Sequence, residues 1–174
     1  MFYLRGCGNV RSVTSFIEQK PRKNRKKSMQ ARLSILTALE RDCFAHPYSA
    51  QQIESLLGDP AYLVLTIEPD GEVETMVTGG SHPVGYLIAY ENHAEGLSEL
   101  HRVAVLPEFR QRGLAHRLLS EWVMRSGGRR LILDVAAKNT AAIALYRRHG
   151  FVMIANRKRY YSDGDDALIF ERAT

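Results

Sequence analysis

The chain has 174 residues, of which 45% are apolar and 25% are charged. This length is enough to bury the core of one domain, and this balance excludes a chain that is disordered throughout. The longest apolar stretches are of strand length, far short of the ~18 residues of a membrane helix, so we expect a soluble protein. Cys7 and Cys43 lack CxxC spacing and indicate neither a disulfide framework nor a thiolate metal site, which favours a reducing, cytoplasmic location.

The positive charge is concentrated at the start of the chain. Residues 1–32 hold nine Lys and Arg against Glu18 alone, whereas residues 33–174 hold 15 basic and 18 acidic residues. We therefore divide the chain into a basic, flexible N-terminal extension, residues 1–28, and a single domain, residues 29–174. Three interpretations of the basic block at 20–27 stay open: a solvated tail, a tether to RNA or the ribosome through phosphate attraction, and a targeting leader.

Two helices are expected first. Apolar residues recur at helical spacing from Ala31 to Cys43, and His46-Pro47 ends that pattern. Ser49 and Gln52 have the spacing of a capping box, which predicts a short second helix that ends at Gly58.

Four strands are expected next. The turn at 68–71 joins strands at 61–67 and 73–77 into a hairpin, and strands at 84–90 and 97–105 follow as the centre of a sheet. The remainder alternates: a helix from Leu114 to Gly127, a strand at 130–135, a helix at 139–148, and strands at 151–154 and 167–171. The order ααββββαβαββ predicts one mixed α/β domain without repeats.

The segment Arg110-Gln-Arg-Gly-Leu-Ala115 lies between a predicted strand and a predicted helix. Gly113 allows a tight turn, and unpaired N–H groups at a helix N-terminus form an anion site suited to a pyrophosphate. Arg110 and Arg112 add positive charge there. The segment therefore predicts a site for a phosphate-bearing ligand.

Two longer segments, Val103–Ala115 and Asn139–Phe151, resemble the acetyl-CoA signature of the GNAT superfamily of N-acetyltransferases. The resemblance covers residues 31–172 and implies one α/β domain with a mixed, mostly antiparallel central sheet, splayed central strands and flanking helices. It also implies that acetyl-CoA is the acetyl donor. The residues it assigns to acetyl-CoA binding are Val103, Ala104, Val105, Arg110, Gln111, Arg112, Gly113, Leu114, Ala115, Asn139 and Tyr146.

A narrower resemblance comes from the segments at 133–139 and 160–167. Both resemble the RimI-type acetyltransferases, which acetylate the N-termini of ribosomal proteins, and Ala45–Ser49 resembles their aromatic substrate loop. This implies that Tyr48, Tyr160 and Tyr161 bind the acceptor peptide. It also implies transfer of the acetyl group to the α-amine of a protein N-terminus, by direct attack in a ternary complex.

Tyr146 is the candidate general acid. It lies seven residues after Asn139, so both fall on one helix face, where one could contact the cofactor arm and the other its sulfur. A phenol with a pKa near ~10 is protonated at neutral pH and can donate a proton to the departing thiolate.

Two carboxylates compete for the role of general base. The RimI-like pattern usually has Glu at the position of Asp134, and other members of the superfamily place their base at the position of Glu99, which shares a strand face with His101. Either would act through a water. An α-amine, with a pKa of about 7.7–8.0, tolerates such a base better than a Lys side chain near ~10.4.

Two other functions stay open: the same transfer to a small-molecule amine or an internal Lys, and a non-catalytic acetyl-CoA-binding module docked on RNA or the ribosome. A basic N-terminus, such as that of a ribosomal protein, would suit the acidic body. His101 and Arg102 differ from the small or amide residues common there in RimI-like sequences, so the preference for the second residue of the acceptor stays open. Neither the six His nor 163–166, which lacks EF-hand order, predicts a metal site.

Overall fold

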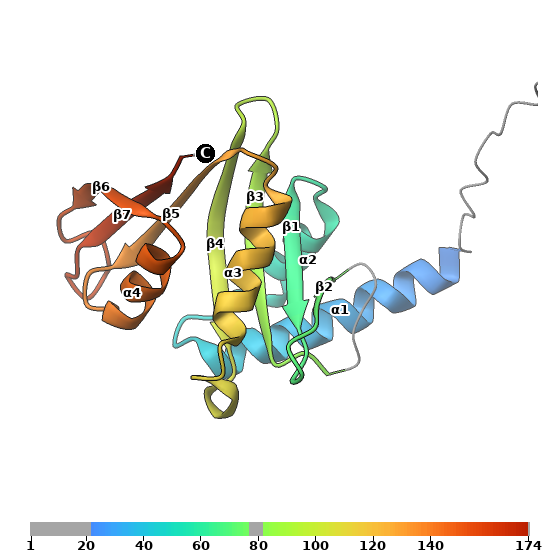
Figure 1. Cartoon of the computed structure of the whole chain (residues 1–174). Coiled ribbons are helices and arrows are strands. Elements are labelled where there is room, and N and C mark those ends of the chain that lie inside the picture. Colours follow the sequence, from blue (N-terminus) through green and yellow to red (C-terminus); the bar gives the residue numbers. More distant parts are fainter. Residues whose placement is uncertain (1–21, 77–81, 174) are drawn as a thin grey trace, which may run out of the picture.

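The computed structural model describes residues 22–76 and 82–173 of the chain. Figure 1 shows one sheet with helices on both faces. Its helices are α1 (Arg22–Cys43), α2 (Ala50–Gly58), α3 (Leu114–Arg125) and α4 (Thr140–Arg148), with a 3₁₀ turn, η1, at Pro107–Phe109. Its strands are β1 (Tyr62–Ile67), β2 (Val73–Thr75), β3 (Gly85–Asn92), β4 (Leu97–Val105), β5 (Arg130–Ala136), β6 (Val152–Arg157) and β7 (Ala167–Arg172).

The seven strands lie in the order β2-β1-β3-β4-β5-β7-β6, and every neighbouring pair is antiparallel except β4 and β5. This confirms the predicted mixed, mostly antiparallel α/β sheet. Among the described residues, no helix is long and apolar enough to cross a membrane.

Strands β4 and β5 pair over a short distance and then separate. Their parallel register runs only from Leu97 and Arg130 to Leu100 and Leu133, although β4 continues to Val105. Figure 1 shows β5, β6, β7 and α4 turned away from the rest of the sheet. The predicted splay of the central strands is therefore present, and it opens the sheet at its centre.

Strand β4 contains a bulge at the point where this separation begins. Leu100 pairs with Ala89 and Arg102 pairs with Ile88, so His101 has no partner of its own on β3. The extra residue resets the alternation of side chains. Arg102 therefore lies on the same face of the sheet as Glu99, which strict alternation would not allow.

Two apolar clusters hold the helices to the sheet. One packs α3 and α4 against one face around Trp122, Leu118 and Phe151. The other packs α1 and α2 against the opposite face around Leu36 and Ile53. The edge of β4 from which β5 separates thus lies between two helix layers, each packed on the sheet by its own apolar cluster.

Several boundaries differ from the predictions. Helix α1 begins at Arg22 rather than Ala31, because Lys and Arg are good helix formers that an apolar pattern does not count. Strand β6 continues past Ile154 to Arg157, because its polar end still pairs with β7. Residues 1–21, which include Cys7 and most of the predicted extension, lie outside the described residues, and so do Val77 and the glycines after it.

Candidate active site

The predicted phosphate site lies at the start of α3. Gly113 is the N-cap residue in a left-handed conformation (φ 79°), and no side chain caps the first N–H groups of the helix. Gln111 also has positive φ (60°), so the loop curls tightly before the helix begins. An uncapped N-terminus on a 12-residue helix presents backbone donors to an anion.

A cleft of about 830 Å³ opens at this helix end. It is lined by seven residues of the segment 105–115, namely Val105, Phe109, Arg110, Gln111, Gly113, Leu114 and Ala115, and by α4 on its other side. Most of the residues assigned to acetyl-CoA are therefore brought together here. His116 and His149, whose ring nitrogens lie 2.6 Å apart, join the two helices beside the cleft. Burial lowers the pKa of His149.

The two arginines of the loop behave differently. Arg110 lines the cleft, and its Nε donates to the Val105 carbonyl at 3.0 Å. Arg112 does not line the cleft; it lies over the Phe109 ring and donates to the Glu108 carbonyl. Arg110 is therefore the better placed of the two to meet a pyrophosphate.

The backbone of β4 connects the cleft to the centre of the sheet. Leu106 N–H donates to the Val84 carbonyl, so the alternating antiparallel pattern turns the backbone groups of Ala104 toward β3 and those of Val103 and Val105 away from it. Beyond Leu100, no described strand pairs with that outer edge. This supports the assignment of Val103 and Val105 to the cofactor arm, whereas the Ala104 side chain packs in the core under α1 and α2.

Cys43 lies nearer to this loop than its sequence position indicates. Its thiol interacts with Arg110, although the two are 67 positions apart. Burial nevertheless raises the pKa of the thiol, outweighing the opposite effect of Arg110. A protonated thiol is a weak nucleophile, in agreement with a mechanism that does not use cysteine.

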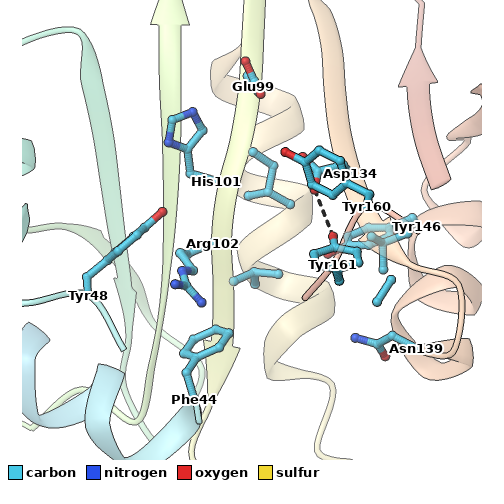
Figure 2. Close-up of a pocket in the computed structure, with 14 residues that line it drawn as sticks. Phe44, Tyr48, Glu99, His101, Arg102, Asp134, Asn139, Tyr146, Tyr160 and Tyr161 are labelled. Carbon is cyan, nitrogen blue, oxygen red and sulfur yellow. Dashed lines mark hydrogen bonds between the residues drawn. The ribbon is translucent and has the colours of Figure 1, made fainter. Parts of the chain in front are cut away.

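A second cavity, of about 560 Å³, opens where β4 and β5 separate. Figure 2 shows its two walls: Phe44, Tyr48, His101 and Arg102 on one side, and Asp134, Asn139, Tyr146, Tyr160 and Tyr161 on the other. Val103 lines this cavity and Val105 lines the cleft, so two positions on one strand link them. All predicted catalytic and acceptor-binding residues line this second cavity.

Tyr146 lies on α4 and is 6% exposed. Burial, with a smaller contribution from the nearby Asp134, raises its pKa to about 12. The phenol is therefore protonated throughout the neutral range, as a general acid requires.

Asn139 is the N-cap of α4, and its Oδ1 accepts the Ala142 N–H at 3.1 Å. The residue lines the same cavity as Tyr146, as the seven-residue spacing predicted. Part of its role is thus structural, because it fixes the start of the helix that carries Tyr146.

Asp134 and Tyr161 form a pair across β5 and the loop before β7. The Tyr161 hydroxyl donates to Asp134 Oδ2 at 3.0 Å. Burial and the Asp134 carboxylate raise the pKa of Tyr161. Tyr160 packs edge-on against Tyr161 and is largely exposed, so its ring can meet a ligand at the mouth of the cavity.

The loop that carries both tyrosines is held by acidic residues. Asp166 accepts hydrogen bonds from Lys158 Nζ and from the Arg159 N–H, and the Lys158 bond is the main reason that its pKa falls to about 2. Asp165 accepts the Lys138 N–H at 3.1 Å. The segment 163–166 thus belongs to the loop that joins β6 to β7. No metal-binding cluster of His, Cys, Asp and Glu occurs among the described residues.

Glu99 lies at the end of the cavity away from Asn139 (Figure 2). It shares this wall with His101, whose ring packs against Tyr62 and Tyr90. The predicted common face of Glu99 and His101 is therefore present. Asp134 lies on the other wall, together with Tyr146, so both candidate bases line the cavity.

Sequence reasoning did not assign Phe44 or Arg102 to this site. The Arg102 guanidinium lies 4.2 Å from the ring centroids of both Phe44 and Tyr48. One signal in the sequence is that Arg102 stands where RimI-like sequences commonly have a small or amide residue. The face of the sheet on which the Arg102 side chain lies depends on the bulge at His101, and no local sequence pattern predicts that bulge.

Comparison with known proteins agrees with this geometry. The chain is 30% identical over 136 residues to the putative ribosomal protein bS18-alanine N-acetyltransferase of Bacillus subtilis, which covers 75% of this chain and 82% of that protein. It is 40% identical over 75 residues to the N-alpha-acetyltransferase RimI of Mycobacterium tuberculosis, covering 42% of this chain and 48% of that protein. With several curated relatives, the match spans about half of their length or less.

Among solved structures, the ribosomal-protein-S18-alanine N-acetyltransferase of Escherichia coli superposes with a TM-score of 0.68 at 26% identity, covering 81% of this chain and 86% of that one. The model of the acetyltransferase (GNAT) family matches residues 33–151, which include α2, α3, α4 and the whole loop at the start of α3. The chain therefore belongs to the acetyltransferase (GNAT) family.

Proposed function

We propose that this GNAT-family acetyltransferase transfers an acetyl group from acetyl-CoA to the α-amine of a protein N-terminus, of the kind found on ribosomal proteins, in a ternary complex. One observation carries the proposal. A free strand edge, Val103–Val105, joins a cleft suited to a pyrophosphate with a cavity that contains Tyr146, Asp134 and a group of aromatic side chains.

The residues present fit acetyl-CoA. The uncapped start of α3 and Arg110 would hold the pyrophosphate, and the outward backbone groups of Val103 and Val105 would pair with the amides of the pantetheine arm. Gln111, Gly113, Leu114 and Ala115 would shape the cradle. Bound there, acetyl-CoA supplies a thioester, whose acyl carbon accepts an amine and whose sulfur leaves as a thiolate.

The chain's own residues would manage the protons. Asp134, held by Tyr161, would take a proton from the acceptor ammonium through a water, and Glu99 is the other candidate for this step. The neutral amine would then form the new N–C bond as the C–S bond breaks, and the second proton that the nitrogen must lose would pass through water to restore Tyr146 after Tyr146 has protonated the sulfur. Tyr146 would give its proton to the departing sulfur. Because the amine itself would attack the thioester, no acyl-enzyme would form and Cys43 would play no part.

The shape of the cavity favours a peptide acceptor. Tyr48 and Tyr160 lie on opposite walls of the cavity, where they could hold the first residues of an extended chain. The names of the Bacillus subtilis and Escherichia coli relatives, both ribosomal protein N-acetyltransferases, support an N-terminus of this class. A cytoplasmic location, and contact of the basic N-terminal segment with RNA or the ribosome, belong to the same proposal.

The test is acetyl-CoA turnover, measured as released thiol, against short peptides. Each peptide with a free N-terminus is paired with an α-blocked version that carries an internal Lys. We expect turnover only with free N-termini. Turnover of the blocked peptides, or of small amines alone, would contradict the proposal and favour the alternative acceptors, and acetyl-CoA binding without any turnover would favour a non-catalytic module.

A further inference from the structure

Arg102 occupies an unusual position in the acceptor cavity. Its guanidinium is stacked between the rings of Phe44 and Tyr48, at 4.2 Å from each centroid. Its Nη2 donates to the His46 carbonyl at 3.2 Å, and its side chain is 20% exposed. Three contacts thus fix a cation in one orientation on the cavity wall, so little side-chain entropy remains to be lost on binding a ligand.

Arg102 forms an ion pair with the buried Glu40, but this pair leaves the hydrogen-bond donors of the guanidinium untaken. Glu40 is fully buried, but its two oxygens already accept hydrogen bonds from the Tyr86 hydroxyl (2.6 Å) and from the Tyr48 N–H (2.9 Å). Arg102 Nε lies 3.8 Å from Glu40 Oε1, too far for a hydrogen bond.

A guanidinium carries five N–H donors. In the described part of the chain, one of those of Arg102 has an acceptor within hydrogen-bonding geometry. The others remain available to a ligand in the cavity.

The position of Arg102 determines which part of an acceptor it can meet. Figure 2 places it on the wall opposite Asp134 and Tyr146, where the proposed function puts the reacting amine. An extended peptide advances about 3.3 Å per residue, so the first few side chains of an acceptor would lie in the same cavity as its reacting amine. The group that best matches a stacked, planar guanidinium is a carboxylate, which can accept two N–H bonds at once.

We infer that Arg102 selects acceptors that carry an acidic side chain, Asp or Glu, within their first three residues. The inference rests on the proposed function and narrows it. The net negative charge of residues 33–174 acts on a basic acceptor at long range, whereas Arg102 acts on one side chain inside the cavity. A Lys or Arg at the same place in the acceptor would be repelled.

The experiment compares kcat/KM for peptide pairs that differ only by Glu against Gln at residue 1, 2 or 3. These two side chains have the same shape, so the ratio isolates the charge. For the wild-type chain we expect at least a tenfold preference for Glu at one of these positions, in line with the strength of a charge-assisted hydrogen bond. Arg102→Met should reduce that ratio to about 1. Because this variant also removes the ion-pair partner of the buried Glu40, the readout is the Glu/Gln ratio within each variant and not the absolute turnover.

Two further variants separate recognition from a structural role. Arg102→Lys keeps the charge without the planar fork and should retain only part of the ratio. Arg125→Gln, on the exposed last turn of α3, is the matched control and should leave the ratio unchanged. If Arg102 only holds the loop, Arg102→Met would instead lower turnover of both peptides equally and lower the melting temperature.

The outcomes distinguish this inference from the proposed function. Robust turnover of free N-termini with a Glu/Gln ratio near 1 at all three positions would overturn the role of Arg102 and leave the function standing. A high ratio that persists in Arg102→Met would do the same. Absence of turnover with every peptide, despite bound acetyl-CoA, would contradict the proposed function itself.

Discussion

Most of the residues that line the cleft at the start of α3 come from one stretch of chain, residues 105–116, whereas the acceptor cavity draws on five separate segments. The cleft is formed by a loop, a positive-φ glycine and a helix end, all of which are local features. The cavity exists only because β4 and β5 separate and because the loops before α2 and β7 fold over the opening. Binding of the donor should therefore depend on local geometry, and choice of the acceptor on the whole fold.

The largest effect expected is at Tyr146. Tyr146→Phe keeps the buried ring and removes the proton that we assign to the leaving sulfur, so kcat should fall by about 10²–10³-fold. Acetyl-CoA affinity, measured by calorimetry, should change by less than about twofold. Tyr90→Phe, which removes a hydroxyl beside His101 without touching the cavity, is the control, and equal losses in the two variants would refute an acid role for Tyr146.

A substitution at Glu40 tests whether acceptor binding depends on contacts outside the cavity. Glu40→Gln replaces one of two acceptor oxygens in a buried network with a donor, which should cost about 2 kcal/mol of unfolding free energy. Because Gln offers one acceptor oxygen to two donors, the Tyr48 N–H and the Tyr86 hydroxyl, this network must rearrange and the loop before α2 should loosen, so the acceptor KM should rise while the acetyl-CoA KM stays the same. Urea unfolding and steady-state kinetics measure both effects, with Glu54→Gln on the exposed face of α2 as the control. A rise in both KM values would contradict the separation of the two sites.

A substitution at Gly113 tests whether acetyl-CoA binding depends on the local conformation of the loop before α3. Gly113→Ala meets no neighbouring atom but places a side chain at φ 79°, a strain of about 1 kcal/mol. The acetyl-CoA KM should rise about fivefold with kcat unchanged. Gly96→Ala at the β3–β4 turn has a similar φ and similar open space, so it carries the same strain away from the cleft. An equal change in KM in both variants would mean that strain acts through global stability instead.

The smallest effect concerns pH. An ordinary Tyr has lost about half of its protons at pH ~10, but burial raises the pKa of Tyr146 to about 12, so its acid form persists to higher pH. The rate should rise as the acceptor α-amine loses its proton and then stay flat from pH 8.5 to 10.5. A decline of kcat centred near pH 10, measured with the fold monitored by circular dichroism, would show that the acid is a less buried group.

The same contrast explains what the sequence could and could not predict. The order of elements and the loop at 110–115 follow from periodicity and turn chemistry, which act over a few residues. The sequence indicated Tyr161 and Asp134 as two separate candidate residues. It could not predict the hydrogen bond between them, because that bond joins β5 to a loop distant in the sequence. The sequence could not predict the interaction of Cys43 with Arg110, because it depends on how the helices pack. Nor could it predict the face on which Arg102 lies, because that depends on one extra residue in β4.

Glu40 also bears on how such an enzyme could be re-engineered. It does not line the acceptor cavity, yet it anchors the backbone of Tyr48 and meets the Tyr86 hydroxyl on β3. A new loop grafted between α1 and α2 would therefore lack the buried hydrogen bond that holds its backbone in place. Exchange of acceptor specificity between relatives should succeed only when the graft carries its own buried acceptor for the loop N–H, together with the partner of that acceptor in the sheet.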